Sequence, residues 1–222
     1  MTLHIIPILK DNYTYLIERN GKAMVIDPGE AEPVLEHLRQ LNTPLNVIVN
    51  THHHGDHTAG NRVLQAEYDC DILKPDAPLK EGVPIDWQGL HFDIYHAPGH
   101  TLDHMILVER TENWLFCGDV LFQLGCGRVF EGTHAQMFQS LQKIYALPDD
   151  LRVYCGHDYA RGNARFALIL GENKMANDIL AQPTEARIGI GHTLGEEKQF
   201  NPFLRCKTVE EFSKVRTLKD HF

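Results

Sequence analysis

The sequence predicts an α+β protein in which two packed β-sheets carry helices on their outer faces. Two groups of strand-like segments, each followed by helix-like segments, favour this arrangement, because a sheet buries its apolar face against another layer. From Gly171 the sequence becomes polar and loop-rich, and we expect 165–222 to form a small, mainly helical C-terminal appendage to a main domain of 1–164. At 222 residues the chain is long enough for one sizeable core.

The first half of the chain predicts a strand meander followed by alternating helices and strands. Turn signals such as Asp11-Asn12 and Asp27-Pro28-Gly29 separate the β-forming runs. Asp27 could be a ligand, but an aspartate before Pro-Gly is more often a turn former, which is the role we expect. Apolar residues at helical spacing predict an amphipathic helix over 30–41, and a second helix is expected from Thr58 to about Glu67. The expected strands are 3–9, 13–18, 22–26, 45–50 and 71–73.

The second half repeats this pattern after a connection, rich in Pro and Gly, that extends through Gly89. Thr133 is a typical helix cap, so a helix is expected over 133–147. The expected strands are 91–96, 104–109, 113–117 and 151–155, and the further helices are 159–170, 173–181 and a last one from Val209 onward.

Composition favours a soluble protein that acts on small molecules. A net charge of −9 argues against nucleic acid as the main partner, because binding its backbone requires clustered cations. The five cysteines contain no C-x-x-C pair, which predicts neither a disulfide framework nor a thiolate zinc site and suggests a reducing compartment. Without a signal-peptide pattern or an apolar run of membrane length, we expect a cytoplasmic monomer with no membrane partner.

Candidate metal ligands gather in the segment 51–57, which reads Thr-His-His-His-Gly-Asp-His and lies between a predicted strand and a predicted helix. Mixed α/β proteins commonly build sites at such strand ends, and imidazoles and carboxylates are costly to bury without a partner. In an extended loop His52 and His54 point the same way and His53 points opposite. Three further candidates follow predicted strands, each directly after a glycine. The full set is His52, His54, Asp56, His57, His100, Asp119 and His157.

Seven ligands exceed what one four-coordinate ion can use, so we expect two divalent ions. His52, His54 and His100 would hold the first ion. Asp56, His57 and His157 would hold the second, with Asp119 and a water-derived hydroxide bridging ions that lie roughly 3.5–4 Å apart. Asp56 and Asp119 are the candidate catalytic carboxylates, and Asp56 could instead be a free general base. The donor set suits zinc, with iron and manganese as alternatives.

Other nearby side chains are expected to play supporting parts. His53, His96 and His104 would be spacers or partners of the ligands. Cys117 and Cys155 lie in predicted strands and are expected to be small buried hydrophobic residues.

The His-x-His-x-Asp-His motif with its later ligands resembles the metallo-β-lactamase fold superfamily, whose architecture is a four-layer αββα sandwich. More narrowly, the chain resembles glyoxalase II, the hydroxyacylglutathione hydrolases, over nearly its whole length. The segments that carry the resemblance are 11–13, 51–57, 97–102, 117–119, 125–133, 155–159, 201–205 and 216–220.

The resemblance implies hydrolysis of the thioester S-lactoylglutathione to glutathione and a 2-hydroxy acid by hydroxide bound to two metal ions. It also implies that glutathione, which has two carboxylates, is bound by charged and hydrogen-bonding side chains. These are Arg128, Tyr159, Arg216 and Lys219, with Phe130 where the family often has a second tyrosine. The alternatives are a lactonase, a thioesterase for another thiol, or a persulfide dioxygenase with one iron. A non-catalytic binding protein would normally have lost some of the ligands.

Overall fold

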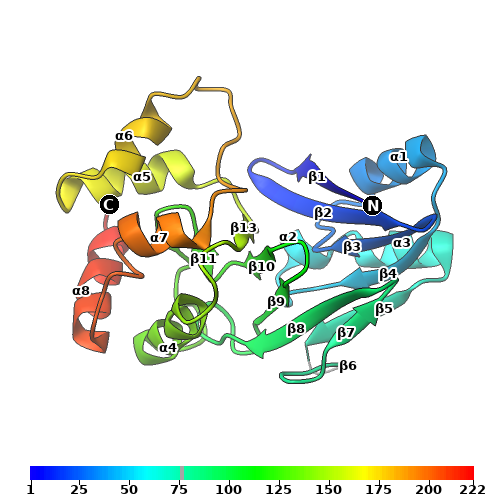
Figure 1. The fold of residues 1–222 in the computed structure, drawn as a ribbon, viewed down its shortest axis with the longest axis horizontal. Helices are drawn as coiled ribbons and strands as arrows, with labels where there is room; N and C mark the ends of the chain where they lie inside the picture. The colour runs from blue at the N-terminus through cyan, green and yellow to red at the C-terminus, as the bar shows by residue number, and fades with distance from the viewer. Residues whose placement is uncertain (76–77) are drawn as a thin grey trace.

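Two β-sheets pack face to face at the centre of the molecule, and helices pack on the outer face of each sheet (Figure 1). The computed structural model describes residues 1–75 and 78–222. Side chains from both sheets meet in one apolar layer that includes Tyr15, Phe92 and Phe116. The predicted αββα sandwich is therefore confirmed.

The first sheet combines an antiparallel meander with parallel strands. Its strand order is β1 (Thr2–Ile8), β2 (Asn12–Arg19), β3 (Lys22–Ile26), β4 (Leu45–Val49), β5 (Asp71–Pro75) and β6 (Pro78–Leu79). Along β2, alternate residues face opposite sides, so Tyr15 and Ile17 contact the second sheet while Leu16 packs toward the helices. The covering helices are α1 (Glu32–Leu41) and α3 (Asn61–Tyr68).

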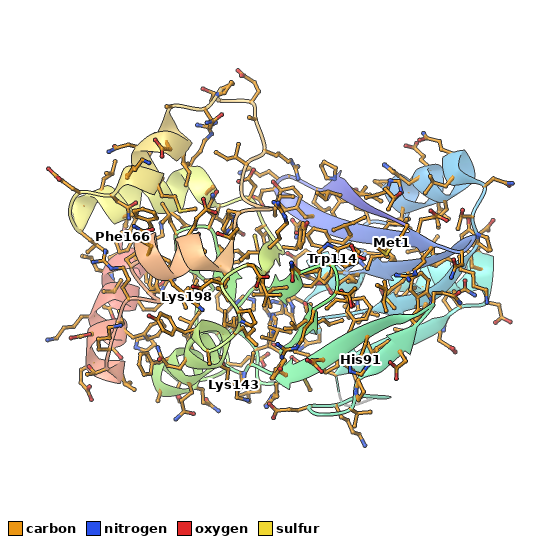
Figure 2. The ribbon with its side chains drawn as sticks, in the orientation of Figure 1. Met1, His91, Trp114, Lys143, Phe166 and Lys198 are labelled. Carbon is orange, nitrogen blue, oxygen red and sulfur yellow. The ribbon has the colours of Figure 1, made fainter. Side chains whose placement is uncertain are left out.

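The second sheet has the order β13 (Arg152–Cys155), β10 (Trp114–Gly118), β9 (Met105–Glu109), β8 (Leu90–His96) and β7 (Ile85–Trp87). Its outer face packs against α4 (His134–Tyr145), through Met137 and Leu141. Thr133 caps this helix as predicted, and the side chain of Gln136 completes a capping box. Figure 2 labels Trp114, which belongs to the layer between the sheets.

The C-terminal helices gather at one end of the sandwich (Figure 1). They are α5 (Ala160–Ile169), α6 (Lys174–Leu180), α7 (Leu194–Phe200) and α8 (Val209–Asp220). Phe166, labelled in Figure 2, packs against Phe203 with ring centroids 6.1 Å apart. Each helix of the described chain is too short or too polar to span a bilayer.

A short hairpin of β11 (Leu121–Phe122) and β12 (Gly125–Cys126) is bound to this C-terminal region through buried polar groups. The fully buried carboxylate of Glu197 accepts the Leu124 N–H at 3.0 Å and the Asn201 amide at 2.6 Å. The Asn201 amide also donates to the carbonyls of Phe122 and Gly125. The hairpin conformation therefore depends on α7.

Several elements differ from the prediction. The helix expected from Thr58 is split into α2 (Gly55–Thr58) and α3, because the Gly60 N–H donates to the Pro28 carbonyl at 2.9 Å and not to the preceding helical turn. Strands β6, β7, β11 and β12 have two or three residues each, too few for a periodic signal. Helix α7 was missed although Thr193 and Glu196 form a capping box. Part of the connection predicted to extend through Gly89 lies outside the described residues.

Candidate metal centre

The carboxyl ends of four strands meet at one edge of the sandwich and carry the predicted ligands. β4 leads into the loop of His52 and His54 and then into α2, which carries Asp56 and His57. Strands β8, β10 and β13 end shortly before His100, Asp119 and His157. All seven side chains predicted as ligands are therefore brought to one place.

One cluster consists of three imidazoles, those of His52, His54 and His100, whose candidate ligand atoms lie within 4.8 Å of one another. His54 Nδ1 lies 3.0 Å from His100 Nε2. His52 is fully buried, and its ring centroid is 4.7 Å from that of His54. The three nitrogens converge as donors to a single ion would.

A second cluster contains Asp56, His57 and His157, again with candidate ligand atoms within 4.8 Å of one another. Asp119 lies between the two clusters. Its Oδ1 is 3.4 Å from His57 Nε2, and its Oδ2 is 3.3 Å from both His100 Nε2 and His157 Nε2. A carboxylate in this position can contact ions in both clusters.

The second nitrogen of four of these rings is hydrogen-bonded to an oxygen of the protein, that of His52 to the Thr51 hydroxyl at 3.0 Å and the other three to oxygens that can only accept. His100 Nδ1 donates to the Arg128 carbonyl at 2.9 Å. His157 Nδ1 lies 2.9 Å from the Asp11 carboxylate, and His57 Nδ1 lies 3.0 Å from that of Asp27. Each of these oxygens accepts the Nδ1 proton and so orients the ring with Nε2 toward the centre, which is the usual arrangement for metal-binding histidines.

Asp27 does more than the turn-forming role that the sequence predicted. Its φ of 52° is that of a turn, but its buried carboxylate also accepts from the Thr51 N–H and hydroxyl and from His57. Asp11 was likewise predicted only as part of a turn. Asp27 directly follows β3, whose parallel neighbour β4 leads to the histidine loop, so the strand-end rule used for the other ligands could have found it.

Of the three histidines expected to be spacers or ligand partners, His104 lies closest to the centre. It is fully buried, stacks on His52 at a centroid distance of 4.7 Å, and its Nε2 accepts the Asp119 N–H. His53 is exposed and contacts Asp103 and Glu131, and His96 contacts the Leu102 carbonyl. Cys117 and Cys155 are both buried, as predicted.

The electrostatics of the centre favour a bound cation. Burial opposes the charge on Asp119, but His57 and His157 outweigh it and hold the pKa of Asp119 well below its usual range. A hydrogen bond from His157 lowers the pKa of Asp56. Burial lowers the pKa of His52 and thus keeps its imidazole neutral, which is the form that binds metal. The carboxylates in turn raise the pKa of His57 and His157 against the effect of burial, so this part of the centre attracts positive charge, whether as protons or as metal ions.

Buried polar atoms provide a direct test of whether divalent ions fit. His52 Nε2, His57 Nε2 and Asp119 Oδ1 are buried and have no hydrogen-bond partner among the described residues. Leaving such atoms unsatisfied costs about 1–3 kcal/mol each. All three point into the space shared by the clusters, where a metal ion would satisfy them. The centre therefore fits divalent metal ions.

A cavity of about 630 Å³ opens above the clusters. Its lining includes His54, Asp56, His100, Asp119 and His157 together with all four predicted glutathione contacts, Arg128, Tyr159, Arg216 and Lys219. The Tyr159 ring stacks on His157 at 4.7 Å. The exposed Phe130 ring lies 5.2 Å from that of His100 and forms part of the rim.

The three cations of the cavity differ in how freely they can meet a ligand. Arg128 is 63% exposed and lies 3.9 Å from Asp220. Lys219 is half-buried, and burial, followed by the nearby Arg216 and Arg128, lowers its pKa to about 8. The Arg216 guanidinium is buried and donates to the Cys126 carbonyl and to Asp220. Arg128 and Lys219 are therefore the more available cations.

The sandwich and its His/Asp clusters are those of a metal-dependent hydrolase of the metallo-β-lactamase superfamily. The family described as "Metallo-beta-lactamase superfamily" matches residues 9–79 and 67–157, and "Hydroxyacylglutathione hydrolase C-terminus" matches 158–222. The crystal structure of ETHE1 from Myxococcus xanthus superposes with a TM-score of 0.76 at 26% identity, over 98% of this chain and 90% of that one. The BLEG-1 B3 metallo-β-lactamase, at 22% identity and a TM-score of 0.72, shares the fold over 92% of this chain and all of its own.

Sequence relatives narrow the class further. The hydroxyacylglutathione hydrolase of Pelagibacter ubique is 41% identical over the full length of both chains. That of Rhodopseudomonas palustris (strain HaA2) is 41% identical over 92% of this chain and 87% of its own, and that of Photobacterium profundum is 36% identical over both full lengths. The chain belongs to the hydroxyacylglutathione hydrolase family.

Proposed function

We propose that this protein hydrolyses the thioester S-lactoylglutathione to glutathione and a 2-hydroxy acid. The observation that carries the proposal is the position of Asp119 between two His/Asp clusters, at the base of a cavity that also holds Arg128 and Lys219. A lactonase, another thioesterase or a persulfide dioxygenase could use a similar centre. The C-terminal family match to 158–222 and the names of the relatives do not favour them.

The assignment of ligands is part of the proposal. His52, His54 and His100 would hold one ion, Asp56, His57 and His157 would hold the other, and Asp119 lies within reach of both groups. The donor chemistry favours zinc, with iron or manganese as alternatives. Asp56 is assigned as a ligand because its Oδ2 lies 3.3 Å from His157 Nε2, inside the second cluster. Bound ions of this kind lower the pKa of a coordinated water and polarise a carbonyl oxygen.

The side chains of the cavity have separate tasks in this scheme. Asp11 and Asp27 hold the tautomers of His157 and His57. Arg128 and Lys219 pair with glutathione carboxylates, which strengthens binding through charge-assisted hydrogen bonds. Tyr159 adds a hydroxyl donor at the cavity wall. The leaving thiol has a pKa of about 8.5 and departs as a thiolate, so the site needs no strong general acid.

We further propose that 1–164 carries the metal centre and 165–222 supplies two of the cavity cations, with α5 spanning the boundary. The working assembly is a monomer in the cytoplasm.

The test is steady-state hydrolysis of S-lactoylglutathione by the metal-loaded protein, compared with the same acyl group on a small thiol that lacks the two carboxylates. The proposal expects a kcat/KM at least tenfold higher for the glutathione ester. Replacing Arg128 by alanine should reduce this preference mainly through KM. Equal rates on both esters would refute the assignment of substrate and leave the metal centre standing.

A further inference from the structure

We infer that Arg187 is a positioning residue for the second metal cluster, that of Asp56, His57 and His157. It acts through the turn between β1 and β2 and touches none of the three directly. The inference rests on the two-metal centre proposed above. It assigns to a residue of the C-terminal region a part in holding the second cluster in place.

Arg187 binds two carbonyls of that turn with one guanidinium group. It lies in the connection between α6 and α7, and its Nη1 donates to the Asn12 carbonyl at 2.7 Å. Its Nη2 donates to the Lys10 carbonyl at 2.9 Å, and its Cζ lies 5.5 Å from the centroid of the Tyr13 ring. The planar fork thus fixes two points of the turn at once, which a lysine ammonium cannot do in the same geometry.

The turn holds hydrogen-bond partners of two side chains in the second cluster. The Asp11 carboxylate lies 2.9 Å from His157 Nδ1, and the Asn12 amide donates to Asp56 Oδ2 at 2.9 Å. Asn12 is only 4% exposed, so its side chain has little freedom to compensate for a shift of the backbone. A displacement of the turn would therefore move His157 and Asp56. The first cluster would stay in place, because these bonds do not connect it to the turn.

Arg187 is presented from a backbone that is itself anchored. The N–H of Ile188 donates to Asp158 Oδ2 at 2.8 Å, and the Tyr13 hydroxyl donates to the same oxygen at 3.0 Å. Further along, the Gly191 N–H donates to the Val153 carbonyl of β13. The guanidinium can therefore restrain the turn, because the segment that carries it is bound to β13 and to the residue after His157.

The test measures metal binding to Arg187→Ala and Arg187→Lys. Zinc-loaded proteins are dialysed against graded concentrations of a chelator, and retained zinc per chain is measured by mass spectrometry. Arg187→Ala should bind the second ion about tenfold more weakly, at the lower end of the effect of removing a residue that supports a ligand. The first ion should be retained as in the wild type. Arg187→Lys should be intermediate, and it serves as the test if the alanine variant does not fold.

Arg161→Ala is the matched control. Arg161 of α5 also donates to backbone carbonyls near the start of the same connection, those of Ile179, Gln182 and Pro183, but it does not contact the β1–β2 turn through these bonds. It should keep both ions. The cobalt-loaded forms add a second readout, since loss of the second site alone changes the visible absorption of one ion only.

The outcomes separate cleanly. Selective loss of the second ion in Arg187→Ala, with the control unchanged, supports the inference. Wild-type affinity for both ions overturns it, as does equal weakening of both ions, because that would mean general support of the fold. A wild-type protein that binds a single ion would overturn the two-metal centre itself, independently of Arg187.

Discussion

Gly156 precedes His157 and lies so close to the centre that its hydrogen cannot be replaced without cost. A Cβ built there would stand 2.3 Å from Asp119 Oδ1 and 2.6 Å from His57 Cε1, whereas ordinary contact begins at 3.4 Å. In Gly156→Ala the Asp119 carboxylate or the His57 ring must therefore move by about 1 Å. A misplacement of about 1 Å costs on the order of 100-fold in rate, or about 2.7 kcal/mol of transition-state stabilisation. Overpacking should also lower the free energy of unfolding by about 1–3 kcal/mol.

The assay is kcat/KM for the glutathione thioester, measured beside zinc content and a denaturant unfolding curve. Gly55→Ala is the control, because Gly55 also directly precedes a proposed ligand, yet a Cβ there meets no described atom within 4 Å. It should change kcat/KM less than threefold. If Gly156→Ala kept two ions and wild-type activity, the positions assigned to Asp119 and His57 would be refuted.

Three other predictions follow from the same geometry. With a pKa of about 8, Lys219 loses its charge as pH rises through 8, so KM for the glutathione ester should increase above that pH, and Lys219→Arg should abolish the increase. Asp27→Asn keeps the turn but removes the charge beside His57, and it should weaken the second ion about 10- to 100-fold in a chelator titration. Removing the metal ions should lower the unfolding free energy by about 2.7 kcal/mol for each ion that had been present at 100 times its Kd. A calorimetric Tm unchanged by chelator would contradict the proposed centre.

The gathering of the seven candidate ligand side chains could be predicted because they lie in the segments that follow strands, where the local sequence signals both the strand and the break after it. The strand-end rule also reaches Asp27, but the contact of Asp27 with His57 and that of Asp11 with His157 could not be predicted, since they join residues 30 and 146 positions apart. Such pairs depend on the order of strands in the sheets. The turn signals in the sequence place both aspartates in loops, but they do not say which side chains the aspartates contact.

The hydrogen bonds of Arg216 could not be predicted from the sequence either. Its charge and its place near the C-terminus are compatible with a cation free to meet a ligand. In the structure its guanidinium is buried, donates to the Cys126 carbonyl and lies 5.2 Å above the Phe203 ring. Only the packing of α8 against the β11–β12 hairpin decides between these two environments.

The bonds that Glu197 and Asn201 make to that hairpin have a consequence for chimeric proteins. Phe122, which lines the substrate cavity, is bonded through its carbonyl to Asn201, 79 residues later, and Leu124 and Gly125 of the same hairpin are bonded to partners 73 and 76 residues later. An exchange of the C-terminal helices between two relatives, made to transfer thiol preference, would separate each hairpin from its own partners. A functional hybrid should therefore carry 121–126 and the C-terminal helices from the same parent, although the two segments are far apart in the gene.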